Sequence, residues 1–316
     1  MLFKWSSGGK DIRYLDLSIR SLHQFYPNEQ YVVCYNGPPE TLDKFKQQIE
    51  HLPLDRIIVV WDYCWPFDFR VSAFWNKYVP PYLEEFGGTQ FHIDNDILFV
   101  KKPSRLEGFK RGIYLTPELD HEYPCNLCCF ALKDIMIERK FTPVNSGIYG
   151  LEAESYTYFR DQFYKFADNL YHSGVDMHET SEQATLALFA QDKCEAGELD
   201  IHWETADYFA NAYSLQRYVD NLHTMPWVTI HFMSMSKVLF ENFYGFFAEH
   251  IFNWNARSLE MLQSLLRVQE LGTGIYNRIT RKDRKVYQIC LEKESGLTDP
   301  NSPGIIDYVN RLVHSR

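Results

Sequence analysis

The sequence lacks any long, uninterrupted apolar run. No stretch reaches the roughly 18 consecutive apolar residues that a membrane-spanning helix requires, and Met1 to Gly9 contain no apolar segment of the secretory kind. Internal repeats and low-complexity segments are lacking too. We therefore expect a globular, cytoplasmic protein.

Cysteine is scarce, at seven of 316 residues, and its odd number excludes a complete disulfide framework. Scattered thiols of this kind are typical of a reducing compartment. Cys125, Cys128 and Cys129 form one cluster that could begin a zinc site. Neither a second cysteine pair nor spaced histidines follow it, so buried thiols are the favoured interpretation.

Positive charge is in deficit, with a formal net charge of −10. Nucleic acids and anionic membranes are usually bound by basic surfaces, so charge alone does not attract the chain to either. One local basic run forms either a solvated face or a contact with an anionic acceptor. It consists of Arg278, Arg281, Lys282, Arg284 and Lys285.

What the sequence does contain is an alternation of strand and helix patterns. Apolar residues make up 45% of the chain and aromatic residues 16%, which indicates a substantial core. The patterns predict strands at 3–5, 31–35, 57–61 and 91–93, and helices at 12–26, at 40–51 and around 74–78. This alternation predicts an α/β fold with a mainly parallel central sheet flanked by helices.

The later part of the chain has fewer clear patterns. Strands are expected at 97–100, 144–150 and 227–232, with helices at 153–169 and from Ser181. Beyond about residue 245 the pattern is helical, and Leu259, Leu262, Leu265 and Leu266 share one face. We expect a catalytic domain over 1–245 and a helical C-terminal extension over 246–316.

Ligands of open α/β sheets bind beyond the carboxyl ends of the strands. One crevice should therefore be formed by Ser6 to Gly9, Asn36-Gly37 and the residues after Trp61.

At another strand end, Asp94-Asn95-Asp96 lies between two apolar segments. Paired carboxylates suit Mg²⁺ or Mn²⁺, which leave coordination positions for phosphate oxygens, although such a pair can also be a solvated turn.

The order of these signals resembles GT-A glycosyltransferases over residues 3–240, and is nearest to glycosyltransferase family 8. Four segments carry the resemblance: Phe91 to Phe99, Asn145 to Ile148, Ser181 to Leu186, and His231 to Lys237. The sequence departs from the family in two places. No proline-tryptophan follows Lys237, and Glu182 stands where aspartate is more usual.

The resemblance implies a site for a divalent cation, Mn²⁺ or Mg²⁺, held by Asp94, Asp96 and His231. It implies that Lys237 contacts the diphosphate of a nucleotide-sugar donor. The remaining donor contacts that it implies are Ser6, Ser7, Gly8, Arg70, Asn76, Lys77 and Asn95.

The implied reaction moves a hexose or similar sugar from a nucleoside-diphosphate sugar to an acceptor hydroxyl. The expected donor is a UDP-sugar, and the expected outcome is retention of the anomeric configuration. Asn145, Glu182 and Gln183 would lie near the transferred sugar. If the enzyme inverts instead, Glu182 or Asp200 is the expected general base.

Two other classes compete with this interpretation. A sugar nucleotidyltransferase would need a longer basic, glycine-rich loop than Ser6 to Lys10. A non-catalytic carbohydrate-binding or scaffold protein would also be rich in aromatic residues.

The expected acceptor of a transferase is a glycan, a protein, a lipid-linked sugar or a modified nucleic acid. Trp203, Tyr208, Phe209 and Tyr213 are expected on its side of the site.

Overall fold

The computed structural model describes residues 1–60, 78, 88–118, 136, 138–173, 181–232, 240–241 and 244–278. The chain divides into two compact units. The first contains Met1–Ile97 and Lys102–Phe209, and the second contains Leu98–Lys101 and the chain from Ala210 onward. This division comes earlier than the predicted boundary at residue 245, which stays a prediction.

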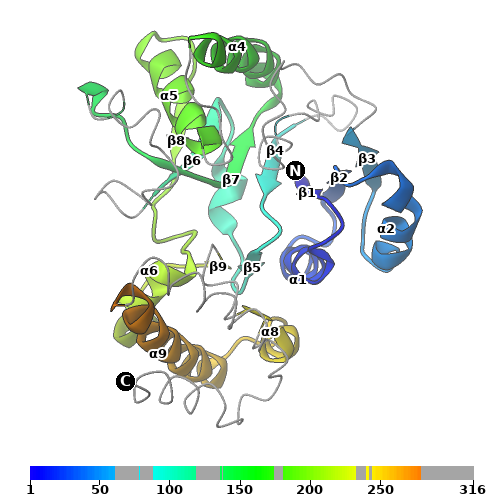
Figure 1. Ribbon diagram of the computed structural model, residues 1–316, viewed down its shortest axis with the longest axis vertical. Helices are drawn as coiled ribbons and strands as arrows, with labels where there is room; N and C mark the ends of the chain where they lie inside the picture. Colours follow the sequence, from blue (N-terminus) through cyan, green and yellow to red (C-terminus); the bar gives the residue numbers. More distant parts are fainter. Residues whose placement is uncertain are drawn as a thin grey trace. The chain divides into compact units, whose positions relative to one another are not determined.

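The first unit alternates strands and helices from its beginning (Figure 1). Its first half contains β1 (Leu2–Ser7), α1 (Ile12–His23), β2 (Gln30–Tyr35), α2 (Leu42–Ile49), β3 (Arg56–Val59) and β4 (Gln90–Ile93). Its second half contains β6 (Ile113–Pro117), β7 (Val144–Leu151), α4 (Ala153–His172), α5 (Ser181–Glu195) and β8 (Ile201–Trp203). The sequence predicted every one of these elements except β6 and β8.

The strands of this unit form one sheet in the order β3-β2-β1-β4-β7-β6-β8. The four strands from β3 to β4 are parallel, β7 is antiparallel to both of its neighbours, and β8 is parallel to β6. The predicted mainly parallel sheet is therefore confirmed. Because β7 runs backwards, its first residues lie at the same edge as the carboxyl ends of β1, β4 and β6.

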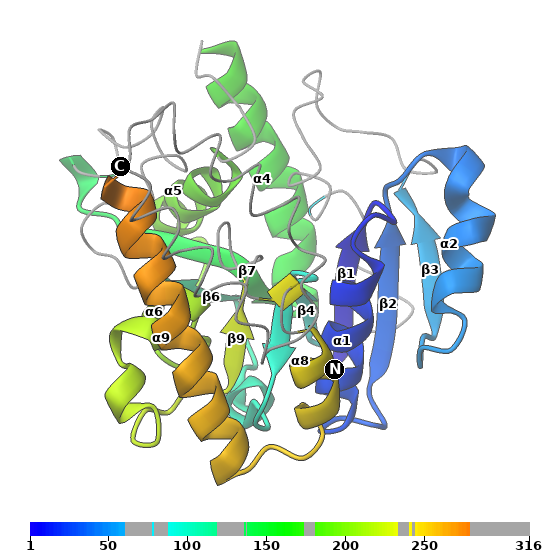
Figure 2. The ribbon, with the colours of Figure 1, turned by 60° about the horizontal axis from the view of Figure 1, so that its bottom comes forward.

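Helices cover both faces of this sheet. On one face, α1 packs on β1, and the indole Nε1 of Trp5 donates a hydrogen bond of 2.9 Å to Ser18 Oγ. On the other, Tyr149 and its neighbours pack in one apolar cluster with Phe163 of α4 and Phe189 of α5. Figures 1 and 2 show α1 and α2 on the first face and α4 and α5 on the second.

The second unit contains a two-stranded sheet of β5 (Ile97–Phe99), which begins at the last residue of the first unit, and β9 (Thr229–His231). Its helices are α6 (Ala212–Arg217), α8 (Tyr244–His250) and α9 (Ala256–Arg278). On α9, Leu262 and Leu266 are buried, and Leu259 and Leu265 are half-buried, so the predicted apolar face is confirmed. None of the helices in the described ranges has the length and apolar character needed to cross a bilayer.

Gly112 provides a test of the β6–β8 pairing. It has a φ of +81°, and an added Cβ would lie 2.1 Å from the Asp200 carbonyl oxygen, which accepts the Ile113 amide hydrogen. Gly112→Ala should therefore lower the free energy of unfolding by roughly 3 kcal/mol or more, measured by urea denaturation.

Gly197→Ala is the matched control, because Gly197 has a φ of +73° and an added Cβ there meets nothing within 4 Å. That variant should lose only the backbone term of about 1–2 kcal/mol. Equal losses in the two variants would contradict the steric explanation.

Candidate metal centre

Asp94 and Asp96 lie in the turn that connects β4 to β5. The Asp94 amide donates to the Gly147 carbonyl of β7 at 2.8 Å, and the Ile97 amide donates to the Asp94 carbonyl at 3.3 Å. The first bond extends the β4–β7 pairing by one residue, and the second closes a tight turn directly after it. Both aspartates can therefore present their carboxylates on one side, and both are half-buried.

His231 is the last residue of β9 and is buried. Its amide donates to the Ala210 carbonyl at 3.1 Å. Strand β9 pairs with β5, and β5 begins directly after Asp96 in the sequence. The chain connection and the strand pairing together explain how a residue so distant in sequence comes close to the aspartates.

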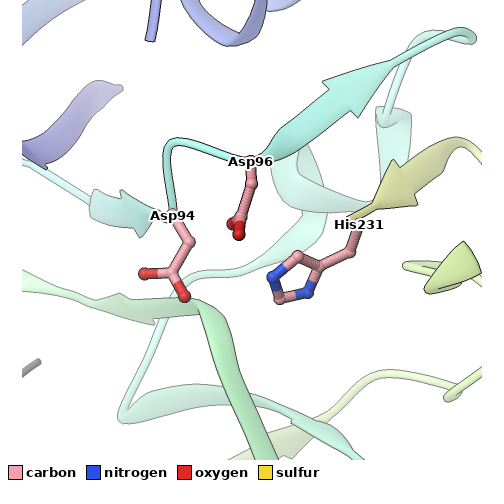
Figure 3. A group of neighbouring side chains, drawn as sticks. All are labelled: Asp94, Asp96 and His231. Carbon is pink, nitrogen blue, oxygen red and sulfur yellow. The ribbon is translucent and has the colours of Figure 1, made fainter. Parts of the chain in front are cut away.

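The three side chains point toward a common space (Figure 3). One oxygen of Asp94, one oxygen of Asp96 and one imidazole nitrogen of His231 all lie within 4.8 Å of one another. Ligand atoms on opposite sides of an Mg²⁺ ion are about 4.2 Å apart, since each bond is about 2.1 Å long. The two carboxylates are ligands that suit Mn²⁺ or Mg²⁺. Because 4.8 Å is an upper limit slightly larger than this separation, small side-chain rotations would bring all three atoms to one ion.

Asp94 has a further partner within the first unit. The Nε2 of His92, in the buried strand β4, lies 3.1 Å from Asp94 Oδ1. The imidazole ring also stacks on Tyr149, with ring centroids 5.3 Å apart.

The turn after β1 is held by its own side chains. Ser7 Oγ donates to Asp11 Oδ1 at 2.7 Å and accepts from the Gly9 amide at 3.1 Å. The Asn95 amide group donates to the Ser6 carbonyl at 2.7 Å and to Asp11. Asn95 therefore joins this turn to the aspartate turn. Asn95 Oδ1 and Ser6 Oγ are buried and have no hydrogen-bond partner among the described residues.

The predicted convergence of the β1 and β2 ends is confirmed. The Asn36 amide donates to the Ser7 carbonyl at 2.9 Å, and a Cβ at Gly37 would lie 2.5 Å from the Gly8 carbonyl oxygen. Gly8 therefore lies against the end of β2. The residues after Trp61, also expected at this crevice, lie outside the described ranges, apart from Tyr78.

The beginning of α5 is fastened to the beginning of β7. Ser146 donates from its amide to Gln183 Oε1 at 2.9 Å and from Oγ to Glu182 Oε1 at 3.0 Å. Tyr78 donates to Glu182 Oε2 at 3.0 Å. Burial, followed by the nearby Glu182 carboxylate, raises the pKa of Tyr78 well above its usual value, so the phenol keeps its proton and remains a donor.

Asn145, next to Ser146, is oriented from two sides. Its Oδ1 accepts from the Gly147 amide at 2.9 Å, and its amide group donates to Glu118 Oε2 at 3.2 Å. Glu118 follows β6 directly, at the same sheet edge as Asp94. Asp94, Asn145 and Glu182 are thus brought to one edge of the first unit.

Other predicted residues are either outside the described ranges or at the opposite ends of the strands. Arg70, Asn76, Lys77 and Lys237 lie outside the described ranges, as do the cysteine cluster and the basic run beyond Arg278. Asp200 precedes β8 and pairs with Arg111 at 2.7 Å, so it lies at the opposite strand ends. Asp200 is therefore wrong as a general base.

The aromatic residues expected on the acceptor side behave differently from one another. Tyr208 and Phe209 are buried, and the Tyr208 ring lies beneath the Arg105 guanidinium at 4.3 Å. These two side chains belong to the core, and their predicted place on the acceptor side stays a prediction. Trp203 is exposed, and the Tyr213 side chain lies outside the described part of the structure.

The sequence interpretation missed Asp11, Tyr78, His92 and Glu118. His92 gave a signal, since it is a polar residue inside the apolar run Phe91 to Ile93. Asp11 gave a weaker signal, because aspartate before a helix is a common N-cap residue. Its carboxylate nevertheless binds Ser7 and not the helix amides. Tyr78 and Glu118 gave none, because their partners are far away in sequence.

Solved structures with a similar fold are glycosyltransferases. An active-site mutant of LgtC is similar with a TM-score of 0.52 and 12% identity over 84% of this chain and 95% of that one. The bifunctional glycosyltransferase WbbM has a TM-score of 0.53 and 10% identity over 82% of this chain and 50% of that one. The chain has the fold of these GT-A-like proteins.

A second LgtC structure, a galactosyltransferase with donor and acceptor sugar analogues, has a TM-score of 0.49 and 13% identity. The alignment covers 84% of this chain and 95% of that one. No protein-family model and no curated protein matches the sequence. The predicted GT-A fold is confirmed, and the resemblance to family 8 stays a prediction.

The Tyr78–Glu182 bond can be tested by removing its hydroxyl. Tyr78→Phe should lower the free energy of unfolding by about 1.5–3 kcal/mol in urea denaturation, because a buried carboxylate loses a donor. Tyr31→Phe removes a buried hydroxyl that donates to the Tyr26 carbonyl at 2.9 Å, a neutral acceptor, and should cost about 0.5–1.5 kcal/mol. A loss at Tyr78 no greater than that at Tyr31 would contradict a charged acceptor.

Proposed function

We propose that this protein is a metal-dependent glycosyltransferase of the GT-A type that moves a hexose or similar sugar from a UDP-sugar to an acceptor hydroxyl. The observation that carries the proposal is the convergence of Asp94, Asp96 and His231 beyond the carboxyl end of β4. In folds of this kind, ligands bind at that edge of the sheet. The resemblance to family 8 favours retention of the anomeric configuration.

Asp94, Asp96 and His231 would hold Mn²⁺ or Mg²⁺. When bound, the cation would stabilise the negative charge that develops on the leaving diphosphate. The chain contributes orientation, because Gly147 and the turn fix the position of Asp94. Lys237, by resemblance, would add a positive charge beside the diphosphate.

The nucleoside would lie against the turn after β1. Ser6 Oγ and Asn95 Oδ1 are buried polar atoms beside this turn, and Ser7 and Gly8 define its course. The Asp11 carboxylate is directed into the turn through Ser7. A negative charge here disfavours phosphate and favours the neutral part of a nucleotide.

The sugar would lie near the start of β7. Asn145 and Gln183 are held there by Glu118 and Ser146, so their amide groups have fixed positions. Glu182 is 3% exposed, and both its oxygens accept hydrogen bonds from protein groups. We infer that Gln183 and Asn145 face the sugar and that Glu182 holds them in place. Arg70, Asn76 and Lys77, by resemblance, would contact phosphate and sugar.

This proposal is favoured over the two alternatives by particular residues. A nucleotidyltransferase would bind phosphates in the turn after β1, where Asp11 would repel them. A carbohydrate-binding scaffold does not require two carboxylates and an imidazole within 4.8 Å of one another. The acceptor would be a hydroxyl of a glycan, a protein, a lipid-linked sugar or a modified nucleic acid.

The experiment measures release of UDP from a panel of UDP-sugars with Mn²⁺ present. Asp94→Asn and Asp96→Ala should each reduce turnover by roughly a hundredfold or more, because the cation loses a ligand while the core is unchanged. Excess chelator should abolish turnover in the wild type.

Asp200→Asn is the control, since Asp200 is an exposed carboxylate at the opposite strand ends. It should retain wild-type turnover. Full activity in both site variants, or turnover that survives the chelator, would disprove the metal-dependent mechanism.

A further inference from the structure

His92 is an unusual residue for its position. It lies in the middle of β4 with 2% of its surface exposed, and its register partners on the flanking strands are Lys4 and Tyr149. The strand residues on either side, Phe91 and Ile93, are fully buried and apolar. A polar ring in such a place costs free energy unless its nitrogens have partners.

The partner of Nε2 is Asp94 Oδ1, at 3.1 Å. An ionised carboxylate can only accept, so Nε2 carries the hydrogen and donates it. The bond engages one carboxylate oxygen. The backbone amide of Asp94 is also bound, by the Gly147 carbonyl, so Asp94 is held at both its backbone and its side chain.

The stacking of His92 on Tyr149 limits rotation of the imidazole. The ring planes differ by 27°, and Tyr149 is itself 3% exposed. Tyr149 packs in turn on Tyr78, which binds Glu182. A ring fixed in this way aims its Nε2–H at one point in space.

We propose that His92 is a positioning residue for the metal centre: its Nε2–H holds Asp94 Oδ1 and thereby directs the other oxygen, Oδ2, toward the cation. The inference rests on the proposed function, because it needs Asp94 to be a metal ligand. Hydrogen bonds that orient a ligand typically change metal affinity by roughly 10- to 100-fold.

The test is the affinity of the full chain for Mn²⁺ alone, measured by isothermal titration calorimetry. His92→Phe keeps an aromatic ring against Tyr149 and removes the donor, so the Kd for Mn²⁺ should rise roughly 10- to 100-fold. His92→Gln places an amide donor near the position of Nε2 and should restore the affinity to within about threefold of wild type.

A control variant separates this effect from the loss of any histidine–carboxylate bond. His51→Phe removes a half-exposed imidazole whose Nε2 lies 2.6 Å from Asp16, on α1, and it should leave Mn²⁺ binding unchanged. Melting temperatures without Mn²⁺ report folding. If His92→Phe does not fold, His92→Asn, whose shorter amide does not reach Asp94, is expected to show the same weakening.

The outcomes distinguish this inference from the proposed function. Mn²⁺ binding by the wild type, lost in Asp94→Asn but unchanged in His92→Phe, would overturn the role of His92 and leave the metal centre intact. A His92→Gln variant as weak as His92→Phe would also overturn it, since packing alone would then explain the loss. A wild type that does not bind Mn²⁺ would overturn both proposals.

Discussion

The candidate site depends on one hydrogen bond, from the Asp94 amide to the Gly147 carbonyl at 2.8 Å. It connects the end of β4 to the beginning of β7, at the place where the sheet changes from parallel to antiparallel. On one side of the bond are the carboxylates that we propose as metal ligands, and on the other are Asn145 and Ser146. A shift at this junction would move the proposed metal ligands and the proposed sugar contacts relative to each other.

Much of the first unit could be predicted from sequence because its signals are local. The apolar run at 31–35 and the helical spacing of Ile12, Leu15 and Ile19 specify their elements without distant partners. Asp94 and Asp96 were found for a similar reason, since two acids after a short apolar strand form a local pattern. The pairings of β6 and β8 were not predictable, because their partners are non-local, and β8 has only three residues.

The roles of individual side chains could be predicted less well than their positions. Asn95 was predicted as a donor contact, and its amide group is committed to Ser6 and Asp11. Glu182 was predicted near the sugar, and its oxygens bind Ser146 and Tyr78. A sequence shows which polar groups are present, whereas the fold decides which of them are used internally. The internal bonds keep the remaining groups in place before a ligand arrives, which reduces the ordering cost of binding.

The two ends of the seven-stranded sheet are short. β3 has four residues and β8 has three, and β8 ends in the exposed Trp203. A short outer strand offers few free amide and carbonyl groups, so another extended chain gains little by pairing with it. The sheet thus carries a built-in resistance to edge-to-edge aggregation, and variants that lengthen β8 are the ones in which poor solubility is expected.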